Sequence, residues 1–140
     1  MNYSDDKNVL ILLSLLKAHN IKKIVTSPGV ANITFVASVQ IDPYFEVYSS
    51  VDERSAAYIA CGLAEESGEP VVISCTGATA SRNYMPALTE AFYRKLPILA
   101  VTSAREIAWV GQNSPQQTDR SVLTRDIARS RLHTPTLHTA

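Results

Sequence analysis

Short apolar runs alternate with segments of helical periodicity along most of this sequence. The predicted strands span 22–27, 45–50, 70–76 and 96–103, and the predicted helices span 8–20, 31–40, 52–67 and 81–95. The runs at 70–76 and 96–103 are almost continuously apolar, which is typical of strands that helices cover on both faces. Strand and helix alternate at the spacing of βαβ units. We therefore predict an α/β fold of three layers (α/β/α), with a mainly parallel sheet between two layers of helices.

The length of 140 residues suits one domain with its own core. We expect this domain to span 1–128. The helical periodicity stops after about Ala128, and the following segment, 129–140, is rich in Thr, His and Pro. We expect this segment to be an irregular tail. It is interpreted as the truncated or frameshifted end of a longer protein, or as the end of one subunit of a protein that is split between two chains.

The charge balance excludes several classes of partner. The chain has 13 basic and 13 acidic residues, so we expect neither nucleic acid nor an anionic membrane surface as a partner. No apolar run approaches the roughly 20 residues of a membrane span, and the first residues do not resemble a signal peptide.

Cys61 and Cys75 lie in apolar surroundings without metal-binding spacing, and the histidines do not cluster. We expect two buried thiols, no metal site made by this chain alone, and a cytoplasmic protein.

Ligands of parallel α/β sheets bind beyond the carboxyl ends of the strands. In this sequence the loops that follow the predicted strands contain Ser27-Pro28-Gly29, Ser49 to Glu53, Thr76-Gly77-Ala78-Thr79 and Thr102-Ser103. These four loops are the candidate site.

Glu53 has two interpretations from its position at the start of a predicted helix. The spacing Ser50-x-x-Glu53 fits a capping box, in which both side chains bind backbone N–H groups at the helix start. Alternatively, the carboxyl group serves chemistry at the carboxyl edge of the sheet. Ala56, Ala60 and Ala64 follow at four-residue spacing and give the helix a smooth face, which suits close approach of another backbone or a flat ring.

Four segments, taken in order, resemble one known domain. They are VTSPG, VDERSAAYIACGLAEESGEPVVISCTGATA, NYMPALTEAFYRKLPILAVTSAR and GQNSPQQTD. Together they are similar to the N-terminal pyrimidine-binding domain of thiamine-diphosphate-dependent enzymes, over about residues 8–125. The likeness is nearest to the menaquinone-pathway synthases, and acetolactate synthases and 2-oxo-acid decarboxylases share the same plan.

The resemblance implies a role for each candidate residue. It makes Glu53 the catalytic glutamate, which contacts N1′ of the aminopyrimidine of thiamine diphosphate. It places the cofactor against Glu53, Pro28, Gly29, Thr76, Gly77 and Ala78, and the substrate against Ser27, Asn32 and Gln116. Without the resemblance, the two glycine loops are also explained as tight turns, and Gln116 as a solvated amide.

Two departures from the family pattern matter. The menaquinone-pathway synthases have Ser-Arg-Ser after Pro-Gly, whereas this chain has Val30-Ala31-Asn32, so the resemblance points to a 2-oxo acid without identifying it. The chain also lacks the Gly-Asp-Gly motif with which the family holds Mg²⁺ and the diphosphate. We therefore expect a homodimer, or a complementary diphosphate-binding domain or subunit, and no activity of this chain alone.

Two other classes of protein fit the same sequence. One is a non-catalytic binding or regulatory module that keeps the fold. The other is an unrelated α/β domain that binds a sugar phosphate or a nucleotide and uses Glu53 only as a helix cap.

Overall fold

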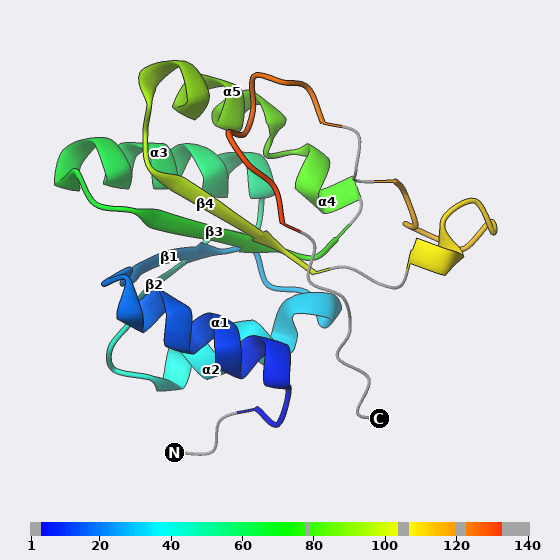
Figure 1. Ribbon diagram of the computed structural model, residues 1–140, viewed down its shortest axis with the longest axis horizontal. Helices are drawn as coiled ribbons and strands as arrows, with labels where there is room; N and C mark the ends of the chain where they lie inside the picture. The colour runs from blue at the N-terminus through cyan, green and yellow to red at the C-terminus, as the bar shows by residue number, and fades with distance from the viewer. Residues whose placement is uncertain (1–3, 78, 104–106, 120–122, 133–140) are drawn as a thin grey trace.

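The computed structural model describes residues 4–77, 79–103, 107–119 and 123–132. Figure 1 shows a parallel sheet with α1 and α2 on one face and α3, α4 and α5 on the other, which confirms the predicted three-layer α/β fold. The strands are β1 (Lys23–Thr26), β2 (Glu46–Ser49), β3 (Val71–Cys75) and β4 (Ile98–Thr102). The helices are α1 (Lys7–Ala18), α2 (Ile33–Ile41), α3 (Glu53–Ser67), α4 (Thr79–Arg82) and α5 (Met85–Arg94), with 3₁₀ turns η1 (Val30–Asn32) and η2 (Ile107–Trp109).

The strands lie in the order β2-β1-β3-β4, and every pairing is parallel. The chain moves from β1 outward to β2, then returns across β1 through α3 to reach β3 and continues outward to β4. The strand order therefore reverses between β1 and β3. In open α/β sheets this is the place where two loops diverge and a ligand crevice forms.

Two hydrophobic cores lie on opposite faces of the sheet. Successive residues of a strand point to opposite faces. Val25 and Ile73 therefore belong to the core under α3 and α5, whereas Ile24 and Val72 belong to the core under α1 and α2. All four of these side chains are fully buried. This burial explains why the central strands read as continuous apolar runs.

The smooth face of α3 packs against the chain's own sheet. Ala56 and Ala60 are fully buried and Ala64 is 1% exposed, all in the core between α3 and the sheet. The small side chains allow α3 to lie close to β1 and β3. The close approach expected of this face is therefore made to the chain's own sheet, and the face is buried within the domain. The opposite face of α3 carries Tyr58, which points away from the sheet and is 47% exposed.

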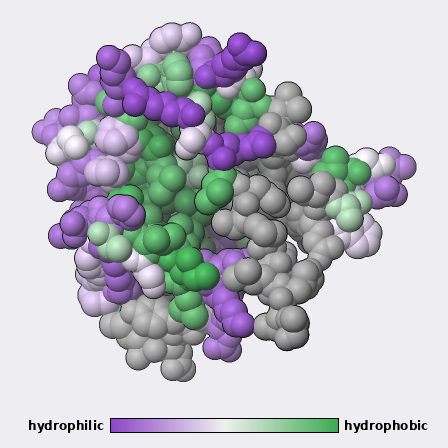
Figure 2. Space-filling view, viewed as in Figure 1, coloured by the Kyte–Doolittle hydropathy of each residue, from purple (hydrophilic) through white to green (hydrophobic). Residues whose placement is uncertain are grey.

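The C-terminal part of the sheet differs from the prediction in one respect. A strand does form at 98–102, but β4 lies at an edge and is only partly covered by the described residues. Leu99 is 40% exposed, and Figure 2 shows apolar side chains down the middle of the face on which β4 lies in Figure 1. An apolar strand sequence indicates a tendency to be buried, but whether the strand is buried depends on which elements pack against it.

The predicted helix at 81–95 is divided into α4 and α5. Pro86 has no backbone N–H, and its ring clashes with the carbonyl four residues earlier. The helical path therefore breaks at Asn83 and Tyr84, and Pro86 lies in the first turn of α5, where the missing N–H costs nothing.

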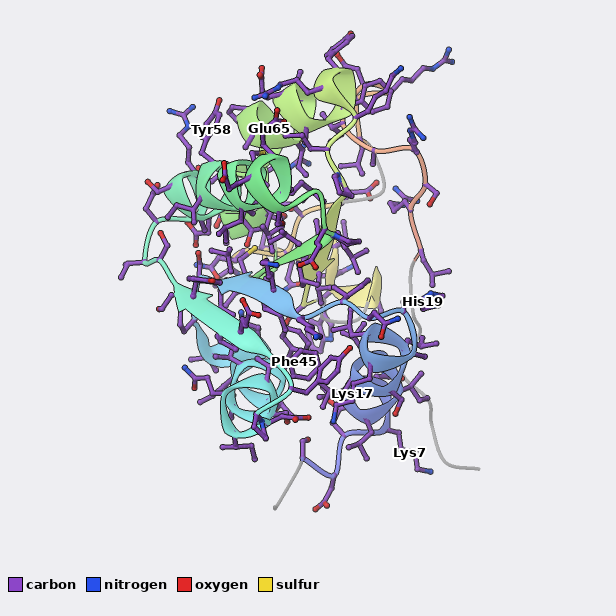
Figure 3. All side chains as sticks on the ribbon, turned by 90° about the vertical axis from the view of Figure 1, so that its left-hand side faces the viewer. Lys7, Lys17, His19, Phe45, Tyr58 and Glu65 are labelled. Carbon is purple, nitrogen blue, oxygen red and sulfur yellow. The ribbon has the colours of Figure 1, made fainter. Side chains whose placement is uncertain are left out.

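Phe45 is buried in the core on the face of the sheet that α1 and α2 cover. Its ring lies between the sheet and α1, and the ammonium group of Lys17 lies 5.8 Å from the ring centroid (Figure 3). Lys17 also pairs with Asp42, whose side chain is 4% exposed. Cys61 and Cys75 are buried and form no disulfide with each other, and burial raises the pKa of Cys61. None of the helices in the described ranges is long and apolar enough to cross a membrane.

Residues 123–132 run back past α5 (Figure 1). Ile127 is buried, and the Tyr93 hydroxyl donates to Asp126 at 3.4 Å, so this segment packs on the domain. Residues 129–132 are exposed and have no regular structure, and 133–140 lie outside the described residues. The boundary at 128 stays a prediction.

We expect Ala60→Leu to lower the free energy of unfolding by about 1–3 kcal/mol, because no room exists for a larger side chain between α3 and the sheet. Gly62→Ala, on the exposed side of the same helix, should raise it by roughly 0.5–1 kcal/mol, since an added Cβ meets nothing within 4 Å. Urea denaturation of both variants measures the difference. Equal stability of the two variants would contradict the packing of α3.

Candidate functional site

The candidate site lies at the carboxyl ends of β1 and β3, where the strand order reverses. The backbone N–H of Ser27 donates to the Ser74 carbonyl at 2.8 Å, so the two strands stay paired up to the point where their loops begin. Beyond this point the loops touch. A Cβ built on Gly29 would lie 2.3 Å from the Cγ2 atom of Thr76. The structure thus brings together two of the predicted loops, and glycine is required for contact rather than for backbone conformation.

Asn32 holds the first loop in shape. Its side-chain carbonyl accepts from the Gly29 N–H at 2.8 Å, and its amide donates to the Ser27 carbonyl at 3.2 Å and to the Ser74 hydroxyl at 3.3 Å. The residue is 2% exposed. Asn32 therefore clamps the loop from inside, and its predicted contact with a substrate stays a prediction.

An apolar groove opens beside this loop, on the α2 side. It has a volume of about 320 Å³ and is lined by Pro28, Gly29, Val30, Ile33, Val36, Ala37 and Gln40. Val30 and Ile33 are 89% and 63% exposed, respectively. Of the segment Val30-Ala31-Asn32, only Val30 lines this groove, at the edge of the site.

Three buried hydroxyl groups beneath the loops have no hydrogen-bond partner among the described residues: those of Thr26, Ser27 and Tyr84. Burial raises the pKa of Tyr84 far above its usual range, and the nearby Cys75 thiol and Glu53 carboxyl act in the same direction. Ser27, which lies nearby, lowers the pKa of Tyr84 and so offsets part of this rise. Buried hydroxyl groups without a hydrogen-bond partner are unusual, and these three form a small polar region within an otherwise apolar core.

Helix α3 begins in a way that frees Glu53. Asp52 is the N-cap: its carboxylate accepts from the Ser55 N–H at 2.7 Å. Hydrogen bonds from Ser55 lower the pKa of Asp52. Ser50 instead donates its hydroxyl to the Asp52 carbonyl at 3.1 Å. The capping box Ser50-x-x-Glu53 is therefore wrong, because the helix begins two residues later than that spacing requires, and Glu53 is its first residue.

The Glu53 carboxyl group is half-buried and has a single partner among the described residues. The side-chain amide of Asn83 donates to its Oε2 at 3.2 Å, across the gap between α3 and the α4–α5 junction. The second oxygen, Oε1, has no hydrogen bond to the described part of the chain. This carboxyl is thus held at one oxygen and open at the other.

The remaining predicted residues are placed as follows. Thr76 and Gly77 are half-buried at the end of β3, and Ala78 lies outside the described residues. Gln116 is exposed and belongs to the described segment 107–119, part of which projects from the body of the domain in Figure 1. The described residues show no contact that joins Gln116 to Glu53. No group of His, Cys, Asp and Glu that could hold a metal ion occurs within the described ranges.

The sequence patterns did not point to Asn83 and Tyr84 as site residues. Pro86 could have indicated them, because a proline predicts a break in the helix just before it. Residues at a break can turn side chains away from the helix face, here with Tyr84 into the core and Asn83 toward α3.

Comparison with known proteins identifies relatives of this chain. Residues 9–123 match the family model "Thiamine pyrophosphate enzyme, N-terminal TPP binding domain". The 2-succinyl-5-enolpyruvyl-6-hydroxy-3-cyclohexene-1-carboxylate synthase of Bacteroides thetaiotaomicron is 38% identical over 137 residues, which is 98% of this chain and 25% of that protein. The synthase of the same name from Porphyromonas gingivalis is 46% identical over 115 residues, covering 82% and 20%, respectively. This chain thus spans about a quarter of the length of these relatives.

A solved structure supports the same fold. The thiamine diphosphate-dependent 4-hydroxybenzoylformate decarboxylase of Rhodococcus jostii RHA1 superposes with a TM-score of 0.70 at 20% identity, over 80% of this chain and 21% of that one.

We expect Gly29→Ala to lower the free energy of unfolding by about 1–3 kcal/mol, because the new methyl group overlaps the Thr76 methyl group. Thr76→Ser removes that methyl group and should restore most of the loss in the double variant. A double-mutant cycle by urea denaturation should give a coupling of roughly 0.5–3 kcal/mol. Additive losses would show that the two loops do not touch.

Tyr84 predicts a particular pH dependence of stability. Its raised pKa keeps the hydroxyl neutral in the folded chain above pH 10, whereas it ionises near pH 10 when unfolded. The unfolded chain then binds fewer protons, so stability present below pH 10 is lost as the pH rises, by up to about 1.4 kcal/mol per unit. Urea denaturation from pH 8 to 11 should show a steeper loss for the wild-type chain than for Tyr84→Phe. Parallel curves would contradict the burial of this hydroxyl.

Proposed function

Because this chain belongs to the thiamine pyrophosphate enzymes, as their N-terminal TPP binding domain, we propose that it forms the half of an active site that receives the cofactor's aminopyrimidine. The single observation that carries the proposal is the Glu53 carboxyl group, held through one oxygen and open at the other. It lies at the carboxyl edge of a parallel sheet, where ligands of such folds bind.

The residues present fit an aminopyrimidine. A flat ring with nitrogen donors and acceptors needs a proton-sharing group at its edge and close backbone around it, which Glu53 and the Gly29–Thr76 contact supply. The Ser27 hydroxyl, buried without a partner, adds a polar atom at the same strand end. We assign cofactor contacts to Pro28, Gly29, Thr76 and Gly77, and also to Ala78.

The proposed chemistry divides between cofactor and chain. Bound thiamine diphosphate would supply a carbon nucleophile, once its C2 proton is lost, and a ring that can accept the electrons released by decarboxylation of a 2-oxo acid. Glu53 shares a proton with N1′ of the pyrimidine, which makes the opposite amino group a better base. Its position at the start of α3 is fixed by the Asp52 cap, so the carboxyl need not hold the helix as well.

The substrate side is proposed to lie at the loop after β1. We propose that Ser27 and Gln116 contact a 2-oxo acid, and that Asn32 shapes this side through its three hydrogen bonds. The apolar Val30 and the groove beside it suit a substrate with an apolar portion.

The proposed enzyme needs a second part. The relatives are about four times as long as the matched region, and no metal-binding cluster occurs in the described part of this chain. We therefore propose that Mg²⁺ and the diphosphate are held by another domain or subunit, with a homodimer or a complementary diphosphate-binding partner completing the site. Two buried cysteines that form no disulfide with each other favour a reducing compartment, the cytoplasm.

We expect Glu53→Gln, in the chain combined with a diphosphate-binding domain, to keep the fold and slow hydrogen–deuterium exchange at C2 of bound cofactor by about 10²–10⁴-fold. Gln still accepts from Asn83 but cannot share a proton with N1′. The rate is measured by NMR after quenching in acid.

Glu66→Gln is the matched control, because Glu66 is an exposed residue of the same helix. It should exchange at the wild-type rate. Wild-type exchange in Glu53→Gln would remove the catalytic assignment and favour a non-catalytic module with this fold.

A further inference from the structure

We propose that Asn83 is a positioning residue for Glu53: its side-chain amide holds one carboxyl oxygen so that the other faces the ligand. The inference rests on the proposed role of Glu53. Its basis is the 3.2 Å hydrogen bond from Asn83 Nδ2 to Glu53 Oε2, which joins residues 30 positions apart in the sequence.

The backbone around Asn83 is fixed from both sides. Its N–H donates to the Ala80 carbonyl at 3.0 Å, and the N–H of Tyr84 donates to the Ser81 carbonyl at 3.3 Å. The Tyr84 side chain is 1% exposed and lies in the core under α3, so it anchors the junction between α4 and α5. An amide on such an anchored turn presents its donor in a defined place.

Stability alone is a weak explanation for this hydrogen bond. Asn83 is exposed, and hydrogen bonds accessible to water add little net stability. Helix α3 does not need the contact either, because Asp52 caps it. The hydrogen bond therefore contributes more to the orientation of the carboxyl group than to the stability of the fold.

The chemistry of the pair favours this role. An amide N–H can only donate, so the Asn83 amide holds the Oε2 atom of Glu53 as its acceptor. The other groups around Glu53 are the neighbouring charges of Asp52 and Arg54 and the buried hydroxyl of Tyr84. None of these three groups forms a hydrogen bond with Oε2 in the described part of the chain. Removal of the Asn83 amide should therefore leave the carboxyl group less firmly held.

The first test uses this chain without cofactor. In the wild-type chain, the side-chain amide protons of Asn83 should change chemical shift as the pH is lowered through the carboxyl range, and in Glu53→Gln this change should disappear. Two-dimensional NMR of ¹⁵N-labelled chain measures both. A pH-dependent shift that persists in Glu53→Gln would overturn the contact.

The second test uses the chain combined with a diphosphate-binding domain and compares Asn83→Ala, Asn83→Asp and Asn83→Gln. We expect Asn83→Ala to slow C2 exchange by roughly 3- to 10-fold, as loss of a donor to a charged group predicts. Asn83→Asp places a second carboxyl beside the first, so the acid limb of its pH–rate profile should move upward by about one unit. Asn83→Gln keeps the donor and should recover part of the rate. Asn20→Asp, the same change at the turn before β1, is the control and should leave the profile unchanged.

The outcomes separate this inference from the proposed function. Slow exchange in Glu53→Gln together with wild-type rates and profiles for Asn83→Ala and Asn83→Asp overturns the positioning role and leaves the function standing. Wild-type exchange in Glu53→Gln overturns both.

Discussion

The parallel pairing of β1 with β3 is the constraint on which the rest of the structure depends. The chain leaves β1 in one direction and returns across it to form β3, so the loops after these strands begin side by side and diverge. Both strands are buried by helices on the two faces, and α3 lies close above them because its inner side carries only small residues. The contact between Gly29 and Thr76, and the position of the α3 start, follow from this arrangement.

Two local signals supply the side chains of the site. Asp52 caps α3, so the Glu53 carboxyl group is not needed as the cap and keeps one oxygen without a hydrogen bond to the described residues. Pro86 ends the helical path that would otherwise run through Asn83, which leaves that amide free to reach Glu53. In each case an ordinary rule of helix termini places a functional group at a helix end, where side chains can point along the axis instead of away from it.

The fold was predictable because it depends on periodicity. Apolar runs of strand length between helical segments leave few arrangements other than a covered parallel sheet, and the family model confirms the domain that the ordered motifs resembled. The errors share one cause. The capping box, the undivided helix at 81–95 and the buried strand at 96–103 were each inferred from a pattern that has several structural outcomes, and the residues that surround each segment in space determine which one forms.

The sequence by itself determined the order of strands and helices along the chain, the sheet edge that carries the candidate site, and the presence of a carboxyl group at the start of α3. Only the tertiary structure decided that Asp52 rather than Ser50 caps that helix, that Asn83 meets Glu53, and that the Tyr84 hydroxyl lies buried beneath them. The physical reason is the range of the interactions. Periodicity and helix termination act over a few neighbouring residues, whereas a hydrogen bond between side chains 30 residues apart requires distances that are set by the packing of α3 and α5 on one face of the sheet.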